Sequence, residues 1–190
     1  MTAPLCEPVS SSSRSRSRRS AALLRSLLLT LFIPASGHLA AGPIKDNPVF
    51  TLLAGKWEGE GELVNTADGF VTQVKETWSG ELTETGNFTM SGKRLFDQNE
   101  HEFAWEFFAN GDLIEGQMKV TDPQLDLRFE AQVNDASRSV TLKVGLSGGG
   151  GVMTIVNTVS GDGLTIEGTV EIVDDTGKIT TTGKVTHRKN

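Results

Sequence analysis

Two oppositely charged residues fall on the apolar sides of neighbouring stretches that alternate like β-strands. Glu76 shares its side with Val74 and Trp78, and Arg94 shares its side with Met90. Because an unpaired buried charge is costly, each of the two must find a polar partner. One interpretation places Arg94 against the acidic head group of a ligand. The other makes Glu76 and Arg94 a structural ion pair, or places them near a rim.

Aromatic residues occupy the same sides of these stretches. Trp78, Trp105, Phe103 and Phe107 would line a pocket around the charged pair, and with that pair they are the candidate ligand-binding residues. Aromatic side chains on an inward face more often simply fill a core, so a filled interior is the alternative.

The sequence lacks an obvious catalytic or metal-binding pattern. Its three histidines are His38, His101 and His187, and no two of them have the spacing of zinc ligands. We therefore expect no metal site, and we expect His101 and His187 to lie at the surface. We also expect that the protein is not an enzyme, because no nucleophile–base pair and no paired catalytic carboxylates stand out. A cluster of Glu76, Arg94 and a histidine at one wet cleft would instead favour catalysis.

Charge is distributed unevenly along the 190 residues, whose formal net charge is −6. The first 37 residues hold five arginines and one glutamate, so the remainder carries a formal charge of −10. Because nucleic-acid affinity comes mainly from Lys and Arg contacts to phosphates, this acidic body argues against nucleic acid as a partner. The same charge argues against an anionic lipid surface.

The N-terminal segment, residues 1–41, has the pattern of a secretory signal peptide. A Ser/Arg run precedes a short apolar centre, and small residues then allow cleavage after Gly37 or Ala41. Cys6 would be removed with it. The apolar centre is shorter than the roughly 20 residues that a membrane span needs. We expect export to the periplasm or secretion, with an organelle transit peptide as the alternative, followed by a polar linker over residues 42–47.

The elements that must position the candidate residues begin at Pro48. Asp46 or Asn47 is placed as an N-cap, and Pro48 begins a short helix that ends at Gly55 and caps the open end of a barrel. From Trp57 onward the apolar period is two, which predicts about ten strands joined by short turns. Short turns produce antiparallel neighbours, and closure removes the exposed edges. Residues 48–190 are thus predicted to form a single all-β, up-and-down antiparallel β-barrel, with a flattened sandwich of the same strands as the alternative.

The G-x-W motif Gly55-Lys56-Trp57, at the first strand after an end-capping helix, resembles the calycin superfamily of lipocalins, fatty-acid-binding proteins and exported bacterial lipocalin-like domains. The resemblance covers residues 47–190. It implies that Trp57 packs at the closed end of the barrel with Arg188, or Lys184, against it. It also implies that an interior Arg94 meets an acidic head group.

The wording Leu-Leu-Ala-Gly-Lys-Trp-Glu-Gly-Glu-Gly is also similar to nitrobindins, which hold haem through a late histidine. His187 is the only late candidate, and the residues around it lack the rest of that pattern, so we expect no cofactor. The predicted function is an exported, monomeric barrel that binds a small apolar or amphipathic molecule. The alternative is a ligand-free structural or protein-interaction module.

Overall fold

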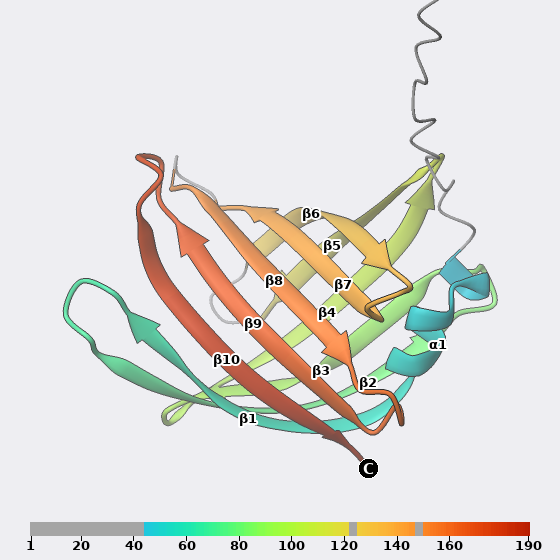
Figure 1. Ribbon diagram of the computed structural model, residues 1–190, viewed down its shortest axis with the longest axis horizontal. Coiled ribbons are helices and arrows are strands. Elements are labelled where there is room, and N and C mark those ends of the chain that lie inside the picture. Colours follow the sequence, from blue (N-terminus) through green and yellow to red (C-terminus); the bar gives the residue numbers. More distant parts are fainter. Residues whose placement is uncertain (1–43, 122–124, 147–149) are drawn as a thin grey trace, which may run out of the picture. The chain divides into compact units, whose positions relative to one another are not determined.

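The computed structural model of the chain describes residues 44–121, 125–146 and 150–190. Ten antiparallel strands form one closed barrel, in which each strand pairs with the next along the chain and β10 pairs with β1 (Figure 1). The prediction of an up-and-down barrel is confirmed, and the flattened sandwich is not formed. The strands are β1 (Gly55–Asn65), β2 (Val71–Leu82), β3 (Phe88–Phe96), β4 (Asn99–Asn110), β5 (Leu113–Val120), β6 (Leu125–Asn134), β7 (Ser139–Gly145), β8 (Val152–Val159), β9 (Thr165–Val173) and β10 (Ile179–Lys189).

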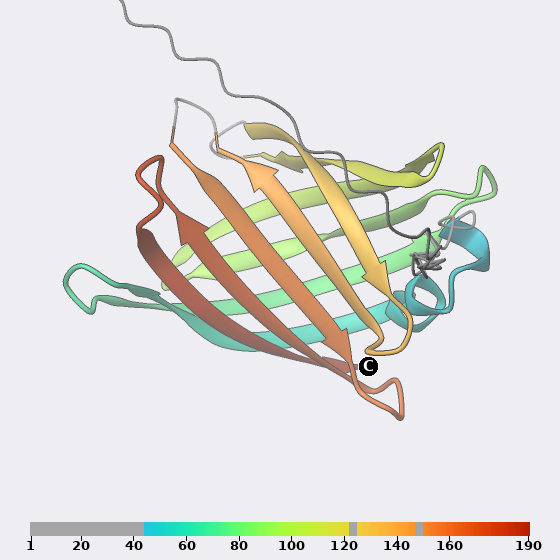
Figure 2. The same cartoon turned by 45° about the horizontal axis from the view of Figure 1, so that its top comes forward.

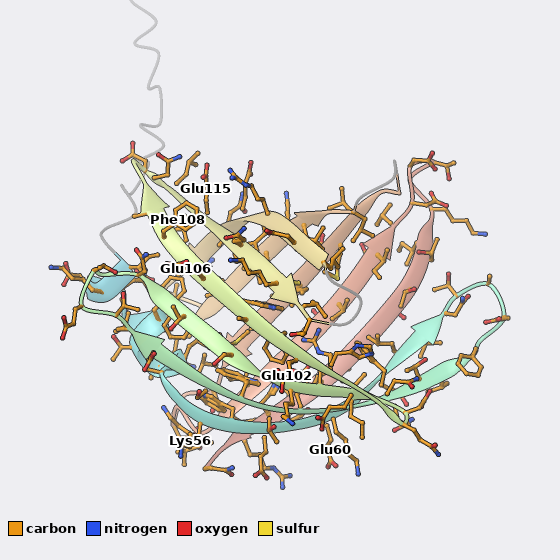
Figure 3. All side chains as sticks on the ribbon, turned by 180° about the vertical axis from the view of Figure 1, so that it is seen from behind. Lys56, Glu60, Glu102, Glu106, Phe108 and Glu115 are labelled. Carbon is orange, nitrogen blue, oxygen red and sulfur yellow. The ribbon has the colours of Figure 1, made fainter. Side chains whose placement is uncertain are left out.

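Alternation along each strand separates the interior of the barrel from its outer surface. On β4, Phe103, Trp105 and Phe107 are buried, whereas Glu102 and Glu106 are exposed. Figure 3 shows Glu102 and Glu106 on the outer side of the barrel. This period of two follows from the pleat, which points successive side chains to opposite faces of the sheet.

Two short helical elements close one end of the barrel (Figure 2). A 3-10 helix, η1 (Ile44–Asp46), leads into α1 (Pro48–Leu53). The Asn47 side chain caps α1 by accepting a hydrogen bond from the Val49 amide at 2.9 Å, and Pro48 occupies the first turn as predicted. The helix stops at Leu53, and Gly55 already belongs to β1.

The expected linker over residues 42–47 differs from the structure where it is described. Ile44 is fully buried and belongs to the hydrophobic core, so the packed domain already includes η1. The burial of Ile44 was not predicted, because a single apolar residue in a polar stretch carries no periodic signal. The signal-peptide prediction lies outside the described residues. The two helical elements of the described residues, of three and six residues, are too short to span a bilayer.

Candidate ligand-binding cavity

A cavity of about 200 Å³ lies inside the barrel, and most of its wall is apolar. Three charged or titratable side chains interrupt this wall: Glu76 from β2, Arg94 from β3 and His187 from β10. Trp105 and Asn157 add further polar atoms. The apolar lining comes from β1, β2, β3, β8, β9 and β10 and consists of Leu63, Val74, Trp78, Met90, Phe96, Met153, Ile155, Val170, Ile172 and Val185.

The sheet register brings the three charged or titratable groups together. Glu76 stands directly opposite Arg94 on β3 and directly opposite Gly59 on β1, and Gly59 in turn stands opposite His187 on β10. Arg94 Nε donates to one oxygen of Glu76, Oε1, in an ion pair. His187 Nε2 lies 2.9 Å from the other oxygen, Oε2. The Glu76 carboxylate therefore joins the guanidinium and the imidazole inside the barrel.

Glu76 remains ionised despite being only 8% exposed. Burial by itself raises the pKa of this carboxyl, but the Arg94 guanidinium and the hydrogen bond with His187 outweigh it and lower the pKa from 4.5 to about 2. An ionised carboxylate only accepts hydrogen bonds, so His187 Nε2 must be the donor in this contact. Its other ring nitrogen, Nδ1, is then the atom whose protonation distinguishes neutral from charged imidazole.

Two buried polar atoms of this lining have no hydrogen-bond partner among the described residues. They are His187 Nδ1 and Trp105 Nε1, on side chains that are 5% and 3% exposed. Buried polar groups are nearly always satisfied in native proteins, because each unsatisfied one costs about 1–3 kcal/mol. Both atoms belong to side chains that line the cavity, and neither finds a partner within the described part of the chain.

Glycine provides the room that the imidazole occupies. A Cβ atom at Gly59 would lie 2.2 Å from His187 Cδ2, far inside van der Waals contact. A Cβ atom at Gly168 would lie 3.0 Å from Asn157 Oδ1. Gly59 on the neighbouring strand β1 thus leaves room for the His187 ring, which meets the Trp78 ring edge-on at a centroid distance of 5.7 Å.

Four of the six predicted ligand-binding residues line the cavity, namely Glu76, Trp78, Arg94 and Trp105. Phe103 lies just outside the lining, where its ring is 5.1 Å from Arg94 Cζ. This contact and a longer one to Trp105, at 6.0 Å, place the guanidinium among aromatic rings.

Phe107, the sixth predicted residue, lies away from the cavity. Its ring contacts Phe50 of α1 at 5.4 Å and Phe129 at 4.9 Å. It shares the inward face of β4 with Trp105, but one full pleat further along it reaches the core beneath the helix.

The cation against Trp57 differs from the predicted one. Lys189 Nζ lies 5.1 Å from the Trp57 ring centroid and donates to the Leu52 carbonyl at 3.1 Å. Arg188 and Lys184 are exposed on the outer face, because the buried His187 fixes odd-numbered residues inward at this end of β10. The resemblance predicted the correct end of β10 for this cation, but it chose residues whose side chains lie on the outer face.

The expectation that His187 lies at the surface is wrong. The residue is the inward neighbour of Val185 on β10, and that alternation, with Gly59 opposite it, is the signal that identifies it as interior. His101, the other histidine of the domain, is half-buried opposite Arg94 on β4, and its ring lies 5.7 Å from that of Phe96. Within residues 44–121, 125–146 and 150–190 no three His, Cys, Asp or Glu side chains are grouped to hold a metal ion.

Comparison with known proteins shows similarity of structure without similarity of sequence. No protein-family model matches the chain, and no curated protein matches it. The S-type phycobiliprotein lyase CPES from Guillardia theta superposes with a TM-score of 0.55 at 10% identity, over 74% of this chain and 90% of that one. Rv2717c from M. tuberculosis superposes with a TM-score of 0.54 at 11% identity, over 75% of this chain and 98% of that one.

These findings correct the expectation that the protein is not an enzyme. A structure similar to this one is named a lyase, so a barrel of this kind gives no ground for excluding catalysis. Glu76, Arg94 and a histidine do meet, but they meet inside a mostly apolar cavity and not at the wet cleft that was expected to favour catalysis. At such low identity the likeness establishes the fold alone, and that fold is a closed, antiparallel ten-stranded barrel.

Proposed function

We propose that the barrel binds a small amphipathic molecule in its interior. The observation that carries this proposal is the cavity of about 200 Å³ inside the barrel, whose apolar wall is interrupted by the Glu76–Arg94 ion pair, His187 and Trp105. A core packed only for stability leaves few voids larger than a water molecule.

The lining divides the ligand into two parts. The apolar wall suits a hydrocarbon or aromatic body, which gains about 25 cal/mol for each Å² removed from water. Trp105 Nε1–H only donates, so the head group must present an oxygen or another acceptor. Arg94, beside Trp105, favours an acceptor that carries negative charge.

A direct test is native mass spectrometry of the domain purified from its own host without denaturation. A reproducible excess mass would identify a retained molecule. Bare protein that also fails to enhance the fluorescence of anilinonaphthalene sulfonate would instead favour a ligand-free structural or interaction module.

Two substitutions test the head-group contacts. Trp105→Phe removes the indole donor and Arg94→Met removes the charge; because hydrogen bonds to charged groups contribute about 1.5–3 kcal/mol, R94M is expected to weaken probe binding about 10- to 100-fold. Arg128→Met is the matched control, since Arg128 is exposed on the outer face of β6. If R94M, W105F and R128M bound anilinonaphthalene sulfonate with equal affinity, the proposal would be contradicted.

A second candidate function is proton transfer on the bound molecule. Glu76 orients His187 through Nε2, which leaves Nδ1 to take a proton from a substrate carbon next to a carbonyl, while Trp105 and Arg94 stabilise the enolate oxygen. The same nitrogen then returns the proton to carbon. Deuterium incorporation from D₂O into a bound ketone, lost in His187→Gln, would support this activity.

We also propose that the protein is exported and that it is a monomer. They are supported by the basic, apolar and small-residue order of residues 1–41 and by a barrel whose strands all pair within one chain. N-terminal sequencing of the protein from its host, together with its mass in solution, tests both.

A further inference from the structure

We propose that Asn157 binds a second polar group of the ligand, on the wall of the cavity opposite Arg94. This inference rests on the proposed ligand-binding function and deepens it. It assigns the ligand to molecules that carry a hydrogen-bonding group at each end of a short apolar body. Asn157 is then the residue that recognises the second of these groups, which is uncharged.

Asn157 is a polar residue in an apolar row. On β8 it lies on the inward face between the buried residues Ile155 and Val159, and it belongs to the lining of the cavity. Because removing an amide from water without a hydrogen bond is costly, an apolar residue would be the ordinary choice at this position. An amide here therefore calls for a partner.

The chain itself does not supply this partner in its described part. The side-chain amide of Asn157 makes no hydrogen bond with any described residue. The residue is half-buried, and its polar atoms are not among the fully buried ones, unlike Nδ1 of His187 and Nε1 of Trp105. A molecule in the cavity can therefore reach the Asn157 amide, which both donates and accepts hydrogen bonds.

A glycine on the next strand leaves room for this amide. Gly168 stands directly opposite Asn157 in the β8–β9 ladder and also lines the cavity. A Cβ atom at Gly168 would lie 3.0 Å from Asn157 Oδ1, which is tighter than nearly all real Cβ contacts. The amide and a side chain at position 168 would thus compete for the same space.

Asn157 and Arg94 belong to opposite walls of the barrel. Their strands, β8 and β3, are five strands apart in both directions round the closed ring of ten. Both residues nevertheless line the same cavity. A ligand in this cavity can therefore meet one polar residue on each side, with apolar lining between the two.

The two walls differ in what they recognise. Arg94 only donates hydrogen bonds, and Glu76 engages its Nε but not its other N–H donors. The described lining on β8 and β9 holds no charged side chain, so a charged ligand group at Asn157 would lack a counter-charge. A hydroxyl suits this wall, because it can donate to the amide oxygen or accept from the amide nitrogen.

The experiment compares two probes of nearly equal shape by isothermal titration calorimetry of the protein. The diol probe is naphthalene with a hydroxyl at each end of its long axis, and the methyl probe has a methyl group in place of one hydroxyl. Because a cavity of about 150 Å³ holds benzene, a two-ring body is a suitable size for one of about 200 Å³. Phenolic hydroxyls, like that of tyrosine, are uncharged at about pH 7.

Two variants remove the amide in different ways. Asn157→Leu keeps the volume of the side chain and Asn157→Ala enlarges the cavity, so a change common to both reports the amide itself. Thr158→Val is the matched control, because Thr158 is the next residue along β8 and is not part of the cavity lining. Urea unfolding checks that each variant is folded.

The measured quantity is the ratio of the affinities for the diol probe and the methyl probe. We expect this ratio to fall about three- to tenfold in N157L and N157A, which is the effect of losing one neutral hydrogen bond. T158V should leave the ratio unchanged. Arg94→Met should weaken both probes, because each keeps one hydroxyl and hydrogen bonds to a charged group are the stronger ones.

The outcomes separate this inference from the function on which it rests. An unchanged ratio in N157L and N157A would overturn the inference, and so would an equal fall in T158V. If the wild type enhanced the fluorescence of anilinonaphthalene sulfonate but bound neither naphthalene probe, the inference would fall and the ligand-binding function would stand. Failure to bind any of the three molecules would overturn both.

Discussion

Trp57 and Trp105 lie in two regions of the same barrel and show how differently one residue type can be used. Trp57, beneath α1, donates from Nε1 to the Leu53 carbonyl at 2.9 Å. Trp105 lines the cavity, and its buried Nε1 has no hydrogen-bond partner among residues 44–121, 125–146 and 150–190. Both side chains are almost fully buried. The Trp57 donor is therefore satisfied from within the chain, whereas the described residues do not satisfy the Trp105 donor.

The surroundings repeat this contrast. Under α1 the rings of Phe50, Phe88 and Phe107 meet one another at centroid distances of 5.2–5.8 Å. Around the cavity a carboxylate, a guanidinium and an imidazole interrupt the apolar wall. We therefore expect stability to depend most on the capped end and the proposed ligand binding to depend on the cavity, so that the two regions respond differently to substitution.

The largest effect is expected at the capped end. Trp57→Ala removes a buried indole, its hydrogen bond and its stacking on Trp78, and should lower the free energy of unfolding by about 3–5 kcal/mol. The measurement is urea unfolding. Trp105→Phe, the matched change in the cavity, should cost less than about 1.5 kcal/mol, because it removes a donor that has no partner. Equal losses in the two variants would abolish the distinction between the regions.

A comparable loss is expected when the buried ion pair is broken on one side. Glu76→Leu leaves Arg94 without its partner and should cost about 3–5 kcal/mol. The double variant Glu76→Leu with Arg94→Met should regain most of this, because replacing both charges by apolar groups is often neutral. A double variant no more stable than E76L would show that the cluster is retained for stability and not for a ligand.

Acid should destabilise the cavity before it affects the capped end. The pKa of Glu76 is lowered from 4.5 to about 2, so its contribution is complete above pH 4.5 and is lost as the pH falls toward 2. A shift of this size corresponds to about 3 kcal/mol of folding free energy. Unfolding measured at several pH values between about 5 and 2 should show this loss in the wild type and a flatter profile in E76Q. Parallel profiles would assign the acid sensitivity to other carboxylates.

The smallest effect on stability is expected from removing the cation at the capped end. Lys189→Met removes the cation over Trp57 and the hydrogen bond to Leu52, and should cost about 0.5–2 kcal/mol. Arg188→Met, one residue earlier on the outer face, should change stability by less than about 0.5 kcal/mol. Thermal unfolding of the two variants compares them directly. A larger loss in R188M would restore Arg188 as the closing cation.

Much of the candidate site was accessible from the pattern of residues. Alternation placed Glu76, Trp78, Arg94 and Trp105 on inward faces, and the structure places all four in the cavity wall. His187 was missed although it obeys the same alternation, because its position near the end of the chain and its polar neighbours suggested a surface residue. A one-residue error in facing also assigned Arg188 where Lys189 lies, since a shift of one residue moves every side chain of a strand to the other face.

By itself, the sequence determined the closed ten-stranded meander, since a period of two with short turns leaves antiparallel pairing and closure as the way to bury one apolar face. It also determined that a buried carboxylate and a buried guanidinium need partners. Only the tertiary structure decided that β10 closes on β1 and thereby brings His187 to Glu76, 111 positions earlier in the chain. The physical reason is that local alternation sets which face a residue takes, whereas barrel closure and register set which distant residues meet on that face.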